Sequence, residues 1–189
     1  MNIIMVRHTR VDVAPGTCYG QTDVSVADTF QQEAEQTKAQ LETYWKDGFP
    51  DAAFTSPLSR ARLLADYCGF ASANADKRLM EMNMGDWEMQ RYDDITDPYL
   101  QQWYDDYLHL PTPNGESFPM QYQRVASFFD ELKGHNYRRV VIFAHGGVLA
   151  AASIYAKLYS PEEAWKHQTP YGGVIALNIA PLATSCRAY

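Results

Sequence analysis

Residues 2–10 read NIIMVRHTR, so an unbroken apolar run ends abruptly in arginine and histidine. Residues 138–147 repeat the arrangement as RRVVIFAHGG, again with a histidine directly after the run. A continuous apolar run, in place of alternation, is typical of a strand that is covered on both faces. The two stretches therefore predict buried parallel strands with His8 and His145 at their carboxyl ends.

Strand and helix patterns alternate along the rest of the chain. We expect strands at 2–7, 52–55, 138–144 and 173–179, and helices at about 27–46, 57–68, 118–133 and 148–158. This order predicts a three-layer α/β/α sandwich with a mostly parallel central sheet. The 189 residues fit a single domain over 1–189, with an irregular helical insertion at about 75–116.

Two serines are expected to start helices. Ser56 is a good N-cap, because Pro57 suits the first helical position and Gly69 suits the stop. Arg60 then falls in the first turn of a helix that follows a strand. Ser117 is the corresponding cap for the helix at 118–133.

The composition limits the classes of partner. The net charge of −7, from 16 basic and 23 acidic side chains, disfavours a nucleic-acid partner. Three cysteines without CxxC spacing argue against a disulfide framework or a zinc knuckle. The first apolar run is too short for a signal peptide, and no run approaches a membrane span, so we expect a cytoplasmic protein.

Four side chains should meet where the strands end, namely those of Arg7, His8, Arg60 and His145. Arginine presents paired donors that match phosphate oxygens, and a neutral imidazole can attack phosphorus. Gly146 and Gly147, next to the start of the following helix, add backbone N–H donors and the positive helix end, which favour an anion. A lone histidine at a strand end is more often structural, but two histidines with two arginines predict phosphoryl transfer through a phosphohistidine.

Other phosphate chemistries lack their signatures in this sequence. No cysteine is followed six positions later by arginine, and there is no GxxxxGK[ST], no HExxH and no Asp-x-Asp after an apolar strand. The reaction is therefore expected to use no metal and no cofactor.

Four motifs together resemble the histidine phosphatase superfamily, also called the phosphoglycerate mutase-like family. They are RHT at 7–9, SPLSRA at 56–61, EMNMGDWE at 81–88 and HGG at 145–147. The resemblance implies a phosphoglycerate mutase-like fold and phosphatase activity, with His8 as the nucleophile that is phosphorylated. Glu81 matches the proton donor; Glu88 is the competing acid and is expected to be structural.

The same resemblance assigns the remaining site residues. Arg7, Arg60 and His145 bind the phosphoryl oxygens and stabilise charge in the transition state. The expected substrate-binding residues are Thr9, Tyr19, Gly20, Gln21 and Gly146. Asp23, in the same loop, is more readily explained as a turn or cap residue.

The stretch GTCYGQTD at 16–23 looks like the alpha-ribazole phosphatases of cobalamin synthesis within that superfamily. Alpha-ribazole 5′-phosphate is therefore the expected substrate; the alternatives are another small phosphorylated metabolite, a phosphoglycerate mutase, or a non-catalytic phosphate-binding module. An aromatic base would need apolar walls, for which the insertion offers Trp87, Tyr92, Trp103 and Tyr107. The stretch from Val174 to Ile179 fits a core strand better than a homo-oligomer interface.

Overall fold

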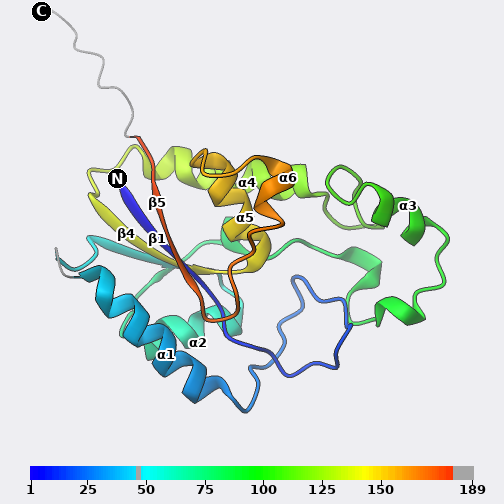
Figure 1. Ribbon diagram of the computed structural model, residues 1–189, viewed down its shortest axis with the longest axis horizontal. Helices are drawn as coiled ribbons and strands as arrows, with labels where there is room; N and C mark the ends of the chain where they lie inside the picture. Colours follow the sequence, from blue (N-terminus) through cyan, green and yellow to red (C-terminus); the bar gives the residue numbers. More distant parts are fainter. Residues whose placement is uncertain (46–47, 181–189) are drawn as a thin grey trace, which may run out of the picture.

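The computed structural model describes residues 1–45 and 48–180, built around a five-stranded sheet (Figure 1). The strands are β1 (Asn2–Arg7), β2 (Ala52–Thr55), β3 (Asn74–Ala75), β4 (Arg139–Ala144) and β5 (Val174–Asn178), in the order β3-β2-β4-β1-β5. All pairings are parallel except that of β5 with β1. The predicted mostly parallel sheet is confirmed; the last residue of the helix predicted at 27–46 and the end of the predicted domain, 181–189, lie outside the described residues.

Helices cover both faces of this sheet. They are α1 (Phe30–Glu42), α2 (Ser59–Tyr67), α3 (Tyr99–Asp105), α4 (Phe118–Leu132), α5 (Gly146–Tyr155) and α6 (Pro161–Ala164). In Figure 1, α1 and α2 lie on one side of the strands, and α4, α5 and α6 lie on the other. This arrangement confirms the three layers. Within the described residues, no helix is long and apolar enough to cross a membrane.

The strand β1 explains why its sequence is apolar without alternation. Ile3 and Met5 belong to the core formed with α4 and α5, whereas Ile4 and Val6 belong to the core formed with α1 and α2. All four side chains are 0% exposed. Because successive side chains of a strand point to opposite faces, a strand buried on both sides needs apolar residues at every position.

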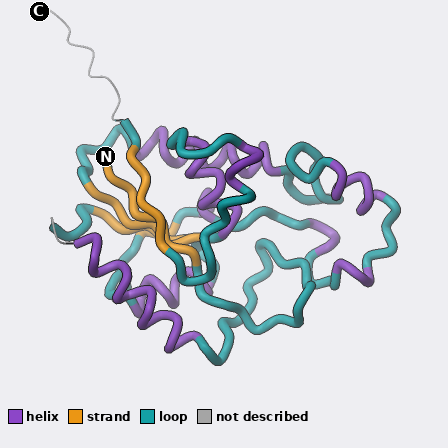
Figure 2. Tube along the Cα trace, viewed as in Figure 1, coloured by secondary structure: helices purple, strands orange, loops and turns teal. Residues whose placement is uncertain are grey.

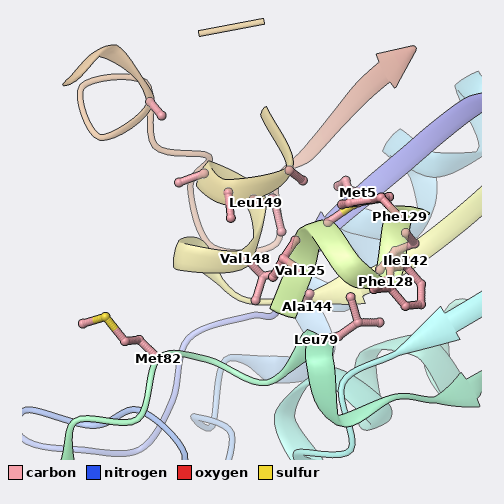
Figure 3. Close-up of a cluster of buried hydrophobic side chains, with 14 of the residues drawn as sticks. Met5, Leu79, Met82, Val125, Phe128, Phe129, Ile142, Ala144, Val148 and Leu149 are labelled. Carbon is pink, nitrogen blue, oxygen red and sulfur yellow. The ribbon is translucent and has the colours of Figure 1, made fainter. Parts of the chain in front are cut away.

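The larger core lies between the sheet and α4, as Figure 3 shows. Phe128 and Phe129 of α4 pack beside Met5 and Ile142 of the sheet, and the two phenylalanine rings meet edge-on at 5.4 Å. This packing fixes β1 and β4 against α4. The strand ends are therefore held on a rigid base.

The insertion predicted at 75–116 contains three short 3-10 helices and α3. The 3-10 helices are η2 (Lys77–Leu79), η3 (Gly85–Trp87) and η4 (Tyr92–Asp94). Figure 2 shows the strands gathered at one end of the molecule, whereas this region is mostly loop and short helix at the other end.

The start of α2 differs from the prediction. The helix begins at Ser59, and Leu58 is still extended at the N-cap position with ψ of 137°. Ser56 therefore does not cap the helix; instead, Asp23 Oδ1 accepts hydrogen bonds from the Ser59 N–H and hydroxyl at 2.8 and 2.7 Å. The expected cap role of Asp23 is observed, and Arg60 keeps its place in the first turn.

The start of α4 agrees with the prediction, whereas the start of α5 differs from it. Ser117 caps α4 as predicted, since its side chain accepts a hydrogen bond from the Met120 N–H. Helix α5 was predicted from 148 but begins at Gly146, so His145 itself occupies the N-cap position. The histidine is thus joined directly to the helix N-terminus.

Candidate active site

The carboxyl ends of three neighbouring strands bring the predicted residues together. Arg7 pairs with Ala144 across β1 and β4, so His8 and His145 follow side by side. Their ring centroids lie 5.1 Å apart with an edge-on tilt of 60°. Ser56 follows the end of β2, which pairs with the other side of β4. The predicted meeting of the strand ends is therefore observed.

The environment of His8 favours a nucleophilic imidazole. His8 is 2% exposed, and its Nδ1 lies 2.7 Å from the backbone oxygen of Thr9. Because a carbonyl oxygen can only accept, Nδ1 carries the proton and Nε2 carries the free lone pair. Burial, with a further contribution from the Arg60 charge, lowers the pKa of His8 to about 3. His8 is therefore neutral at physiological pH.

His145 is more deeply enclosed than His8. It is 0% exposed, and its Nε2 lies 2.7 Å from the Ser56 hydroxyl oxygen. Burial, followed by the proximity of His8 and Arg60, holds the pKa of His145 well below its ordinary value. Its Nδ1 is buried and has no hydrogen-bond partner in the described part of the chain. A second neutral imidazole thus lies beside the nucleophile.

Arg7 is held by groups from the loop before β5. Its Nη1 donates to the backbone oxygen of Thr169 at 2.7 Å, and its guanidinium lies 4.1 Å from the ring centre of Tyr171. A Cβ at position 146 would lie 3.2 Å from Arg7 Cζ, so the glycine there lets the guanidinium approach the helix N-terminus. Tyr171 had no signal in the sequence, because it lies in a loop outside every motif.

Arg60 is fully buried behind the histidines. Its Nη1 and Nη2 donate to the backbone oxygens of Thr22 at 3.0 Å and Gly20 at 2.6 Å. These two bonds fix the guanidinium plane, and the Arg60 charge contributes to the lowered pKa of His8. The loop at 19–22 therefore supports the site by orienting Arg60 with its carbonyl groups.

Glu81 lines the cavity beside the histidines, and three N–H groups hold its carboxylate. Oε1 accepts from the Met82 N–H and from Gln121 Nε2, both at 2.9 Å, and Oε2 accepts from the Gly147 N–H at 3.2 Å. A Cβ at Gly147 would lie 2.4 Å from Glu81 Oε1, so a larger residue there would displace the carboxylate from this position. Arg124 also donates to the Glu81 backbone oxygen at 2.9 Å.

Glu88, the competing acid, accepts hydrogen bonds from backbone N–H groups and from a threonine hydroxyl. Its carboxylate accepts from the N–H groups of Gln21 and Thr22 at 2.7 Å, from the Met84 N–H at 3.1 Å and from the Thr22 hydroxyl. Although burial alone raises the pKa of Glu88, these hydrogen bonds together lower it. The carboxylate therefore stays ionised and joins the 19–22 loop to η3.

The residues predicted to bind substrate fall into two groups. Tyr19 and Gly146 line the cavity together with Arg7, His8 and Glu81. Thr9, Gly20 and Gln21 lie behind its wall: Thr9 is 0% exposed, Gly20 faces Arg60 and the Gln21 side chain donates to the Glu81 backbone oxygen at 3.1 Å. This second group shapes the site from behind.

The cavity next to His8 has a volume of about 230 Å³ and a largely aromatic wall. The wall is formed by Met82, Met84, Tyr92, Trp103, Tyr107, Phe118, Trp165 and Gln168. Three of the four aromatic residues named from the sequence are present. Trp87 is not one of them, because it packs in the core against Trp103 with the ring centres 5.5 Å apart.

Trp165 and Gln121 are among the wall or support residues that sequence reasoning missed, as is Gln168. Trp165 follows α6 and carries no motif. Gln121 had a signal, since it is a polar residue on the apolar face of a helix that also carries Phe118 and Val125. Such a buried amide needs a partner, and that partner is Glu81.

Comparison with known proteins places this geometry in a family. The profile of the Histidine phosphatase superfamily (branch 1) matches residues 3–189. An alpha-ribazole phosphatase structure from Shigella flexneri superposes with a TM-score of 0.84, covering 95% of this chain and 91% of that one at 24% identity. At 24% identity, the similarity to this alpha-ribazole phosphatase structure concerns the fold alone.

Curated relatives carry three different activities. A 2,3-bisphosphoglycerate-dependent phosphoglycerate mutase of Cytophaga hutchinsonii is 30% identical over 176 residues, 85% of this chain and 79% of that protein. Phosphoserine phosphatase 1 of Hydrogenobacter thermophilus is 24% identical over 153 residues, covering 77% and 71%. The adenosylcobalamin/alpha-ribazole phosphatase of Escherichia coli is 33% identical over 107 residues, about half of each chain at 53% and 52%. The chain belongs to the histidine phosphatase superfamily.

Proposed function

We propose that the chain is a phosphomonoesterase that forms a phosphohistidine on His8 and acts on alpha-ribazole 5′-phosphate. The observation that carries the chemistry is the state of His8: its Nδ1–H is held by Thr9, its Nε2 carries a free lone pair, and the residue lines a cavity together with Arg7 and Glu81. A free lone pair beside cationic donors and a carboxyl group meets the needs of nucleophilic phosphoryl transfer.

In the first step, His8 Nε2 attacks phosphorus and the bond from phosphorus to the substrate alcohol oxygen breaks. The acid form of Glu81 gives its proton to that leaving oxygen, which departs as the neutral alcohol. The charges of Arg7 and Arg60 stabilise the negative charge on the phosphoryl oxygens in the transition state.

In the second step, Glu81 works as the base. Its carboxylate takes a proton from water, the water oxygen attacks phosphorus, and the bond from Nε2 to phosphorus breaks to release inorganic phosphate. The three N–H groups on the carboxylate keep Glu81 beside the reacting oxygen in this step. His8 returns to its neutral form.

The cavity wall supports a leaving group with a flat apolar ring. Tyr92, Trp103, Tyr107, Phe118 and Trp165 all lie along it, and aromatic surfaces bind such a ring by stacking and burial. Among the described residues that line the cavity, Arg7 is the one cation, and phosphoryl oxygens occupy it in this mechanism. Phosphoserine and phosphoglycerate each carry a carboxylate, for which the wall offers no second cation. Alpha-ribazole carries an aromatic base and no carboxylate.

A substrate panel tests both parts of the proposal. The wild type and His8→Ala are assayed with p-nitrophenyl phosphate, alpha-ribazole 5′-phosphate, phosphoserine and 3-phosphoglycerate, with and without EDTA. We expect kcat/KM for alpha-ribazole 5′-phosphate to exceed that for phosphoserine by roughly tenfold or more, since stacking and burial of its base contribute at least about 1.4 kcal/mol. EDTA should have no effect.

The panel also separates the alternatives. Phosphoryl transfer to a phosphoglycerate in place of water would identify a mutase. Vanadate binding without turnover of any substrate would identify a phosphate-binding module. Equal turnover of alpha-ribazole 5′-phosphate and phosphoserine would keep the phosphatase chemistry and reject the substrate.

A further inference from the structure

The hydroxyl of Ser56 is not explained by the start of a helix. Ser56 is 0% exposed, and α2 begins only at Ser59, so the hydroxyl does not cap this helix. The hydroxyl oxygen lies 2.7 Å from His145 Nε2 and 3.3 Å from the Leu58 backbone nitrogen. The Leu58 N–H can only donate, so Ser56 Oγ accepts that bond.

The direction in which Ser56 points its hydroxyl proton determines which ring nitrogen of His145 carries a proton. With Oγ already accepting from Leu58, donation of the hydroxyl proton to His145 Nε2 satisfies both groups. The reverse arrangement, with Nε2 donating, would leave the Ser56 hydroxyl proton buried and without a described acceptor. Buried polar groups are almost always hydrogen-bonded, which favours the first arrangement.

Donation from Ser56 leaves the proton of the neutral His145 on Nδ1. We infer that Ser56 is a positioning residue that holds His145 in the Nδ1–H tautomer, so that this N–H donates to a phosphoryl oxygen at His8. The Nδ1 atom is buried and has no other partner among the described residues. The part of the inference that concerns the phosphoryl oxygen rests on the proposed function. The tautomer of His145 does not depend on it.

Both histidines are then neutral with the proton on Nδ1, but they have different roles. Thr9 holds the proton of His8 on Nδ1 and leaves Nε2 as a nucleophile. Ser56 accepts no proton from His145 and leaves Nδ1–H as a donor. With the rings 5.1 Å apart, one neutral imidazole attacks phosphorus while the other stabilises a phosphoryl oxygen. The opposite tautomer would turn a lone pair toward that oxygen.

Nitrogen NMR of the uniformly labelled full chain measures the tautomer directly. Two-bond proton–nitrogen spectra distinguish a protonated ring nitrogen from a bare one, and the spectrum of His145→Gln assigns the His145 signals. We expect protonated Nδ1 and bare Nε2 for His145 in the wild type. Bare Nδ1 with protonated Nε2 would overturn the inference. In Ser56→Ala the His145 signals should move toward the other tautomer.

Kinetics with p-nitrophenyl phosphate test the consequence. Ser56→Ala should lower kcat by about 10- to 100-fold, less than the roughly 10²- to 10³-fold that follows removal of an oriented donor, because the variant keeps the His145 imidazole and loses only its fixed tautomer. KM should change less than kcat. Ser56→Thr keeps the hydroxyl and should restore both the rate and the wild-type tautomer. The matched control is Thr55→Val, which removes a neighbouring buried hydroxyl that donates to the Ser56 backbone oxygen, and which should keep the wild-type rate.

The outcomes separate this inference from the proposed function. An Ser56→Ala protein with wild-type kcat and wild-type His145 signals overturns the inference. A wild type without phosphatase activity, whose His145 still carries its proton on Nδ1 and loses that preference in Ser56→Ala, contradicts only the proposed function. Should Ser56→Ala fail to fold, the wild-type spectrum and Ser56→Thr still decide the tautomer.

Discussion

The two ends of the cavity are built in different ways. At the phosphoryl end, Arg60 and His145 are fully buried, and the charged or polar groups follow strand ends of the sheet. At the other end, Trp103 and Tyr107 come from loops and short helices of the insertion. The sheet thus fixes the arginines and histidines at the phosphoryl end, while the insertion supplies Glu81 and part of the surface that meets the leaving group.

This difference separates reaction chemistry from substrate choice. Changes at the strand ends should lower kcat for every phosphomonoester by a similar factor. Changes in the aromatic wall should alter KM for substrates with an aromatic leaving group and leave small phosphate esters unaffected.

The largest effect is expected for His8→Ala. Without Nε2 no phosphohistidine can form, so kcat should fall by roughly 10⁴-fold or more for every ester in the panel. Rapid acid-free quenching with radiolabelled phosphate ester should trap an acid-labile phosphoprotein in the wild type and none in the variant. A trapped phosphoprotein in His8→Ala would place the nucleophile elsewhere.

The next effect compares the two candidate acids. Glu81→Gln should lower kcat/KM by about 10²- to 10⁴-fold for an alkyl phosphate, because the leaving oxygen loses its proton donor in the first step. The loss of kcat/KM should be smaller for p-nitrophenyl phosphate, whose leaving oxygen needs little protonation. A uniform loss of kcat/KM across both esters would show that Glu81 is not the acid.

Glu88→Gln is the matched control for Glu81. Its carboxylate accepts three N–H bonds and a hydroxyl bond between the 19–22 loop and η3, so the main effect should be on stability. Hydrogen bonds to a charged group contribute about 1.5–3 kcal/mol each, and we expect a loss of about 2 kcal/mol in urea unfolding. A loss of kcat without loss of stability would exchange the roles of the two glutamates.

The sequence predicted the phosphoryl end better than the leaving-group end for a physical reason. His8 and His145 follow apolar strands, and the parallel pairing of β1 with β4 alone suffices to bring them together. The partners of Ser56 and Tyr171 depend on loop conformation, which no periodicity records. Trp87 and Trp103 look alike in sequence and both belong to the core, yet only Trp103 also lines the cavity. In an irregular segment this difference depends on the surrounding packing.

The histidine pair at the phosphoryl end also predicts how stability depends on pH. Burial lowers the pKa of His8 from 6.5 to about 3 in the folded protein. Between these values the unfolded chain binds more protons, so the free energy of unfolding falls as pH is lowered below 6.5. From His8 alone the fall between pH 7 and pH 5 is about 2 kcal/mol. His145, whose pKa is also lowered, contributes in the same direction.

Urea unfolding at pH 7 and pH 5 checks this dependence. His8→Asn should remove about 2 kcal/mol of the difference between the two pH values. The exposed His167 provides the control, since His167→Asn should keep the wild-type difference. An unchanged difference in His8→Asn would mean that folding does not lower the pKa of His8.

The smallest effect concerns the far end of the cavity and tests the division most finely. Tyr107 lines the cavity and is 39% exposed, so Tyr107→Ala should remove wall surface without disturbing the core. We expect KM for alpha-ribazole 5′-phosphate to rise about fivefold, equivalent to about 1 kcal/mol of lost aromatic contact, with kcat unchanged. Tyr104→Ala is the matched control, because Tyr104 is 46% exposed nearby but does not line the cavity. KM for phosphoserine should not change in either variant; if it rises equally in Tyr107→Ala, the wall does not select an aromatic leaving group.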